Sequence, residues 1–234
     1  MKTTEVTPNL IQLTKWGMMN AYLVREEDGF TLVDTTMNAA DAILAASVSA
    51  GGVIRRIVLT HGHGDHVGSL DALREKLGTG TEVLMPALDA AIHAGQAVAP
   101  PARKRGSWPK LDTVPDTLLA PGDRIGNLEV IATPGHTPGH SSFLDSRDGV
   151  IIAGDALSNI GGLAVPNHAH MRFPLPYLGT CDRPATVASA QHIRELAPNV
   201  LVFGHGPALH EPRQSLDAAL RIAEGKRSSQ QRSR

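Results

Sequence analysis

Residues 57–66 read IVLTHGHGDH, so a short apolar run leads directly into three histidines and one aspartate separated by glycines. The run 57–60 predicts a short buried strand. Asp65 taken alone would suit the N-cap of a helix expected over 67–77. Together, however, these polar side chains cannot all face an apolar core without a large desolvation cost. Gly62 and Gly64 leave the loop free to turn its imidazoles toward one point. The spacing therefore indicates metal ligands at a strand end.

Three more polar residues follow predicted strands later in the chain. They are His136 in ATPGHTPGH, Asp155 in IIAGD and His205 in FGHGP. Alone, Asp155 fits a turn equally well, and His205 fits an ordinary loop histidine. Because loops that leave strand ends assemble the sites of layered α/β folds, we expect all three to join the first cluster.

The number of candidate ligands indicates two metal ions. Five histidines and two aspartates exceed the four donors of one tetrahedral zinc site. Two ions about 3.5–4 Å apart, sharing a carboxylate and a hydroxide, would use all of them. Imidazole and carboxylate without thiolate suit zinc, iron or manganese. We expect two divalent metal ions, with zinc first and iron or manganese as alternatives.

The surrounding pattern predicts an α/β fold. Strands are expected at 11–14, 21–24, 30–33, 57–60, 81–85, 117–120, 129–132, 141–144, 150–153 and 200–203. Helices are expected at 38–50, 67–77, 87–94, 184–196 and 210–223. A meander with helices, followed by another, favours two sheets packed face to face with helices outside.

The chain length fits a single domain, which we place at residues 1–224. The polar, basic end at 225–234 is expected to be a disordered tail. Residues 96–110 predict a long surface loop, and we interpret its basic run 103–105 as solvated rather than as an anion site.

Composition limits the partners. The 22 basic and 23 acidic residues give a net charge of −1, without the basic excess typical of nucleic-acid binding. We see no secretory h-region and no apolar stretch of about 20 residues that would span a membrane. The single cysteine, Cys181, fits a reducing compartment and a buried position. We expect a cytoplasmic protein with a small-molecule substrate and no nucleic-acid or membrane partner.

Over nearly its whole length, the chain resembles the metallo-β-lactamase-fold superfamily, whose hallmark is His-x-His-x-Asp-His after a strand. The segments around His136, Asp155 and His205 match later family motifs, and NAYLV at 20–24 with TLVDT at 31–35 matches the opening hairpin. The resemblance implies a four-layered αβ/βα sandwich of two mixed β-sheets, in the small, single-domain, dinuclear branch.

The same resemblance implies how the ligands divide. One metal would take His61, His63 and His136, the other would take Asp65, His66 and His205, and Asp155 would bridge them. We expect a bridging hydroxide to attack a carbonyl carbon, with Asp65 as the catalytic proton shuttle. Asp34 is a candidate hydrogen-bond partner of a ligand imidazole, or alternatively a turn residue.

Differences from known branches of the superfamily narrow the class of substrate. Only 29 residues follow His205, which disfavours the C-terminal helical domain of glyoxalase II-type thiolester hydrolases. Ser158 stands where acyl-homoserine lactonases place a tyrosine. Lactone or ester hydrolysis is our first choice. The alternatives are a mononuclear iron, persulfide dioxygenase-like oxidoreductase and a thioesterase- or β-lactamase-type hydrolase.

Two parts of the chain are candidates for contacts outside the metal ligands. The apolar, Pro-rich segment 161–179 suggests a pocket wall or lid, with Phe173 and Tyr177 as substrate-binding residues; core packing is the alternative. Trp16, near the opening hairpin, would overhang the site or serve a homodimer contact.

Overall fold

The computed structural model describes residues 1–102 and 108–232, with side chains described up to residue 225. The basic run 103–105 therefore lies outside the described residues. Within the described part the strands form two sheets, one of seven strands and one of six.

The first sheet has the order β1-β2-β3-β4-β5-β6-β7. Its strands are β1 (Lys2–Thr7), β2 (Leu10–Lys15), β3 (Met19–Glu26), β4 (Gly29–Val33), β5 (Ile54–Val58), β6 (Glu82–Pro86) and β7 (Thr117–Leu119). The first four strands are antiparallel, whereas β4 to β7 pair in parallel. The sheet is therefore mixed, as expected.

The second sheet has the order β13-β12-β11-β10-β9-β8. Its strands are β8 (Arg124–Ile125), β9 (Leu128–Ala132), β10 (Ser141–Asp145), β11 (Val150–Ile152), β12 (Val200–Val202) and β13 (Leu209–His210). Only β11 and β12 pair in parallel.

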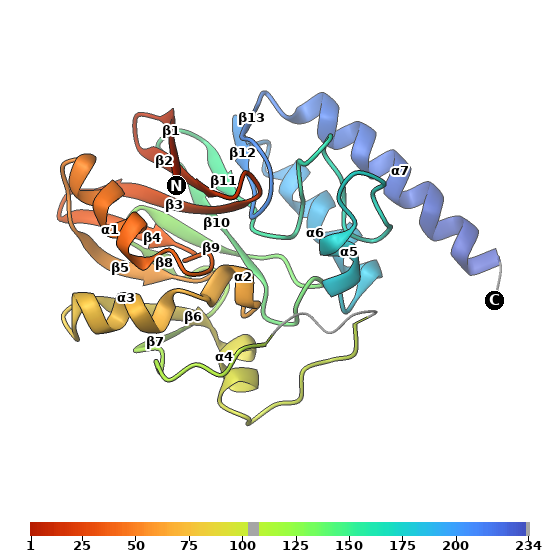
Figure 1. Cartoon of the computed structure of the whole chain (residues 1–234). Coiled ribbons are helices and arrows are strands. Elements are labelled where there is room, and N and C mark those ends of the chain that lie inside the picture. Colours follow the sequence, from red (N-terminus) through yellow and green to blue (C-terminus); the bar gives the residue numbers. More distant parts are fainter. Residues whose placement is uncertain (103–107, 233–234) are drawn as a thin grey trace.

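Alternation along the strands separates three apolar layers. In β4, Leu32 packs toward helices α1 (Ala40–Ser49) and α3 (Leu70–Leu77), and Val33 packs between the two sheets. In β12, Val202 packs between the sheets and Leu201 packs toward α6 (Arg183–Glu195) and α7 (Arg213–Arg232). Because successive strand side chains point to opposite faces, each sheet carries helices on its outer face. Figure 1 shows α1 and α3 on one side of the strands and α6 and α7 on the other. The predicted four-layered sandwich is confirmed.

The predicted elements near the metal motif are found with small shifts. The helix expected at 67–77 is split into α2 (Gly64–Val67) and α3, and Asp65 lies in the first turn of α2 rather than capping it. Helix α4 (Ala87–His93) follows β6 as predicted. The short helix α5 (Leu175–Gly179) was not predicted.

The C-terminal segment differs from expectation. We predicted a disordered tail from residue 225, but α7 continues through Arg232. Residues 213–223 anchor this helix, because Leu216, Ala219, Leu220 and Ala223 are buried against α6 and the second sheet. The polar residues after them extend an existing helix, which needs no new nucleation.

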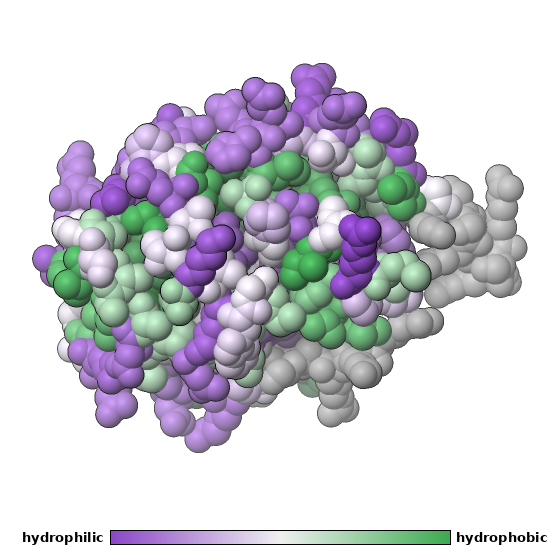
Figure 2. All heavy atoms as spheres, turned by 45° about the horizontal axis from the view of Figure 1, so that its top comes forward, coloured by the Kyte–Doolittle hydropathy of each residue, from purple (hydrophilic) through white to green (hydrophobic). Residues whose placement is uncertain are grey.

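The surface mixes polar and apolar residues. On the face shown in Figure 2, hydrophobic residues gather in several separate patches between hydrophilic ones. Within the described residues, no helix is both long and apolar enough to cross a membrane.

Candidate metal centre

The seven predicted ligands come from four loops that leave strand ends. His61, His63, Asp65 and His66 follow β5, and His136 lies between β9 and β10. Asp155 follows β11 and His205 follows β12. The structure brings all seven together, although 144 residues separate the first from the last (205 minus 61).

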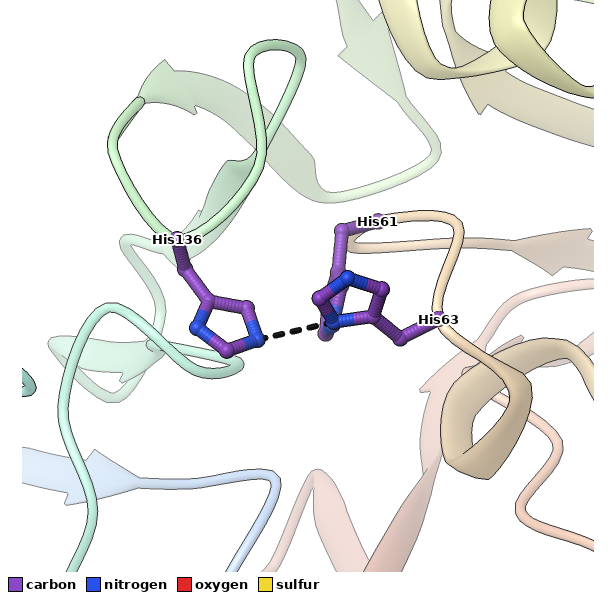
Figure 3. A group of neighbouring side chains, drawn as sticks. All are labelled: His61, His63 and His136. Atoms are coloured by element: carbon purple, nitrogen blue, oxygen red, sulfur yellow. Dashed lines mark hydrogen bonds between the residues drawn. The ribbon is translucent and has the colours of Figure 1, made fainter. Parts of the chain in front are cut away.

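The first group is His61, His63 and His136, which offer ligand atoms within 4.8 Å of one another. Figure 3 shows the three rings converging from two loops, with His63 Nδ1 2.9 Å from His136 Nε2. All three side chains are buried. This is the set that the family resemblance implied for one metal.

The second group is Asp65, His66 and His205, whose ligand atoms also lie within 4.8 Å of one another. His205 Nε2 lies 3.2 Å from Asp65 Oδ2. The Asp65 side chain retains 35% exposure, whereas the two imidazoles are buried. In the second group, Asp65 is therefore the side chain that reaches solvent.

Asp155 lies between the two groups. Its Oδ2 is 3.4 Å from His136 Nε2 and 3.3 Å from His205 Nε2. Its Oδ1 is 3.5 Å from His66 Nε2. One carboxylate thus faces histidines of both groups, as a bridging ligand must.

Hydrogen bonds orient the ligand imidazoles. Asp34 Oδ2 accepts from His66 Nδ1 at 2.7 Å, which confirms the predicted role of Asp34 as an imidazole partner. Other Nδ1 atoms pair with Thr60 Oγ1 (His61), Thr180 Oγ1 (His136) and the Met18 carbonyl (His205), each at 3.0 Å. The Thr60 hydroxyl donates to Asp34 and that of Thr180 to the Pro176 carbonyl, so each oxygen accepts from its imidazole. In all four rings Nδ1 is thus occupied away from the cluster, and Nε2 is the atom left to bind a metal among the other ligands.

The buried cluster divides the histidines by charge. Burial lowers the pKa of His61, His136 and His63, in the last case to about 4. Burial also opposes charge on His205, but Asp155 and Asp65 outweigh it and raise its pKa to about 10. In the same way, Asp34 and Asp155 raise the pKa of His66 against its burial. The carboxylates therefore favour positive charge at and beside His66 and His205.

The donors fit a metal centre. Among the described side chains, His61 Nε2, His66 Nε2 and Asp155 Oδ1 are buried without a hydrogen-bond partner. Buried polar atoms normally have a partner, and leaving one unpaired costs about 1–3 kcal/mol. All three atoms point into the ligand cluster. Divalent cations bound here would coordinate these three unpaired atoms and would also balance the negative charge of the carboxylates.

Asp89, a residue that the sequence did not single out, connects the loops of the first group. It is fully buried in α4 and accepts from the Gly62 and Gly139 amides, at 2.9 and 2.7 Å. It also accepts from the Thr137 hydroxyl at 2.6 Å. In the sequence, Asp89 shows only as an acid in the first turn of a helix, which is a common and uninformative position.

The predicted substrate-binding residues do not line the cavity that opens beside the first ligand group. Phe173 packs against His205 with ring centroids 5.0 Å apart, and Arg183 lies over the ring of Tyr177. Both side chains are buried. A cavity of about 530 Å³ opens beside His63 and His136, and neither Phe173 nor Tyr177 lines it. Their contact with substrate stays a prediction.

Known proteins resemble this chain in sequence and structure. The chain is 38% identical over 211 residues to the uncharacterized protein YobT of Bacillus subtilis, covering 88% of this chain and 90% of YobT. It is 34% identical over 145 residues to a hydroxyacylglutathione hydrolase of Cereibacter sphaeroides, covering 60% of this chain and 49% of that enzyme. The crystal structure of TTHA1623 in a di-iron-bound form aligns with a TM-score of 0.63 and 28% identity, covering 86% and 94% of the two chains.

The family comparison agrees with the geometry. The sequence pattern described as "Metallo-beta-lactamase superfamily" matches residues 14–205, a span that includes every candidate ligand. The chain therefore belongs to the metallo-β-lactamase superfamily.

Proposed function

We propose that the protein is a metal-dependent hydrolase that cleaves a carbonyl ester-type bond. Lactones or esters are the substrates that we propose first. One observation carries the proposal: two three-ligand groups lie side by side with Asp155 between them. The hydroxyacylglutathione hydrolase similarity supports carbonyl hydrolysis, although it spans about half of that enzyme.

The residues would divide between two ions. His61, His63 and His136 would hold one, Asp65, His66 and His205 the other, and Asp155 would contact both. Bound ions would supply Lewis acidity and water activated near neutral pH. Zinc is our first choice, because imidazole and carboxylate suit it, with iron or manganese as alternatives. The di-iron form of TTHA1623 supports keeping iron in the comparison.

Asp65 is the residue best placed to move a proton. Burial tends to raise its pKa, but His66 and His205 outweigh burial and lower it. The carboxylate is therefore ionised at neutral pH, and its partial exposure lets it meet both water and substrate. We propose that Asp65 accepts a proton as the nucleophile forms and returns it toward the leaving oxygen.

The experiment combines metal analysis with a substrate screen. The full chain, loaded in turn with zinc, iron or manganese, is assayed on lactones, esters, thioesters, β-lactams and phosphodiesters. We expect two ions per chain and hydrolysis of lactones or esters. Asp155→Asn should bind fewer ions and lose activity at least 100-fold, consistent with roughly 10²–10³ for losing one electrostatic group. Asp71→Asn, at a carboxylate in α3 away from the cluster, is the matched control.

Several outcomes would contradict the proposal. Full activity and two retained ions in Asp155→Asn would remove the bridging role. One iron per chain with oxygen consumption would indicate a persulfide dioxygenase-like oxidoreductase instead. We also propose that the enzyme is cytoplasmic and acts on a small molecule. We propose that it forms a homodimer in which exposed apolar residues, such as the 66% exposed Trp16, contact the second copy.

A further inference from the structure

The cavity beside the first ligand group has an apolar wall. Its volume is about 530 Å³, within the roughly 300–1,000 Å³ typical of small-molecule pockets. His63 and His136 form one side, and residues 98–102, Trp108 and Pro138 form much of the rest. The metal ligands thus face an apolar space large enough for an extended group.

The described lining carries no permanent charge. None of the described lining residues is Arg, Lys, Asp or Glu. The thiol of Cys181 also lines the cavity, and burial raises its pKa to about 11, so it remains neutral at pH 7.

The Trp108 side chain packs against the loop that carries the ligands His61 and His63. Its ring lies 5.2 Å from those of both His63 and His93. A Cβ added to Gly62 would stand only 2.4 Å from Trp108 Cζ3, so the indole packs directly on the ligand loop. His93 connects the ligand loop to the segment that follows Trp108. Its Nε2 lies 2.8 Å from the Gly62 carbonyl, and its Nδ1 lies 3.0 Å from the Pro109 carbonyl.

Gly179 lines this cavity next to the two ligand rings. A Cβ at this position would lie 3.3 Å from His136 Cε1 and 3.5 Å from His63 Cε1. Gly179 is the last residue of α5, and its backbone is not in the left-handed region that favours glycine. The missing side chain therefore leaves space beside the two ligands rather than serving the backbone.

We propose that this cavity binds the apolar acyl chain of the substrate and that Gly179, by lacking a side chain, keeps open the space between that chain and the two ligands His63 and His136. This rests on the proposed ester or lactone hydrolysis and names the part of the substrate that the protein selects. The chain would lie along residues 98–102 and Trp108, with its carbonyl toward His63 and His136. Gly179 is then a specificity-determining residue.

The first test measures binding without hydrolysis. Trp16→Phe leaves Trp108 as the single tryptophan, because the sequence contains two. The fluorescence of Trp108 in the metal-loaded full chain is titrated with N-methylbutanamide, N-methylhexanamide and N-methyloctanamide. We expect the affinity for the amides to rise about fourfold per added methylene until the cavity is full.

The second test measures selectivity in turnover. Gly179→Val should reduce kcat/KM for p-nitrophenyl octanoate at least tenfold, and the acetate ester should lose less. The matched control is Gly80→Val, because a Cβ at Gly80 would meet nothing within 4 Å and its backbone is not left-handed. It should leave both esters unchanged. Metal content is measured for each variant, so that loss of the first ion is recognised.

The outcomes separate this inference from the proposed function. Amide binding that strengthens with chain length and is lost in Gly179→Val supports the cavity role, even if no ester is hydrolysed. Ester hydrolysis with equal kcat/KM at every chain length, unchanged in Gly179→Val, would overturn the cavity role and leave the hydrolase proposal standing.

Discussion

Asp89→Ala should weaken both the fold and one half of the metal centre. The carboxylate is fully buried and joins the loop of His61 and His63 to the loop of His136. Removing it orphans two backbone amides, those of Gly62 and Gly139. At about 1–3 kcal/mol for each buried donor left unpaired, the expected loss in the free energy of unfolding is about 2–6 kcal/mol.

The assay is urea unfolding of the metal-free chain, followed by metal competition against a chelator. Asp89→Asn keeps the shape but places an NH₂ group opposite donors, so we expect an intermediate loss. Asp71→Ala is the matched control: Asp71 also accepts from two backbone amides, those of Asp112 and Thr113, but it is partly exposed. Water replaces its hydrogen bonds, and we expect a change below about 1 kcal/mol.

Metal binding should respond selectively. The first group loses its loop alignment in Asp89→Ala, and we expect one of two ions to bind about 10–100-fold more weakly, as when other supporting residues are removed. The second ion should bind nearly as before, because Asp89 touches none of its ligands. An Asp89→Ala chain with unfolding free energy within about 0.5 kcal/mol of the parent and two unchanged metal affinities would refute this reasoning.

Four further predictions concern the centre itself. Metal binding near pH 7 should release about two protons, because His66 and His205 have raised pKa values and must be neutral to bind; calorimetry in buffers of different ionisation enthalpy counts them, and no release would contradict the pKa directions. In the metal-free chain, the stability that protonated His205 contributes should be complete below pH about 6.5 and be lost as the pH rises through about 10; urea midpoints across this range check the sign. Asp34→Asn should weaken metal binding about 10–100-fold by removing the carboxylate at His66 Nδ1, whereas Asp41→Asn, at an exposed carboxylate, should not; equal affinities would refute it. Chelation of the loaded protein should lower Tm by roughly 8–16 °C, if ions present at about 1,000 times Kd contribute about 4 kcal/mol; an unchanged Tm would argue against metal binding by the folded state.

The fold was predictable where apolar runs were strong. The buried runs of β3, β11 and β12 define their strands without help from the rest of the chain. The strand predicted at 57–60 overlaps only the end of β5, because Arg55 and Arg56 interrupt the apolar pattern at its start. Strand β1 was missed because its residues, KTTEVT, are largely polar and exposed and show no alternation. Strands β8 and β13 have two residues each, too few to produce a pattern.

The ligands were predictable for a different reason. Histidines and aspartates next to glycine at strand ends carry their chemistry in the local sequence. Asp89 carries no such signal, because its importance comes from two distant loops that fold against it.

The cavity was hidden in the same way. Of the segment 161–179, predicted as a pocket wall or lid, Gly179 lines the cavity. The described wall is otherwise built largely by 98–102 and Trp108, within a segment interpreted as a surface loop. Trp108 packs against Gly62 and thereby positions this segment. The sequence of the loop has no periodic pattern from which this contact could be predicted.

The position of His205 near the end of the sequence fixes the order in which the centre can assemble. During synthesis, His61, His63, Asp65 and His66 leave the ribosome long before β12 exists. His136 and Asp155 come next, yet the second ligand group stays incomplete until residue 205 has emerged and β12 has paired with β11. Stable loading of both ions therefore comes after the two sheets have met, so a full metal complement marks a chain whose two sheets have come together.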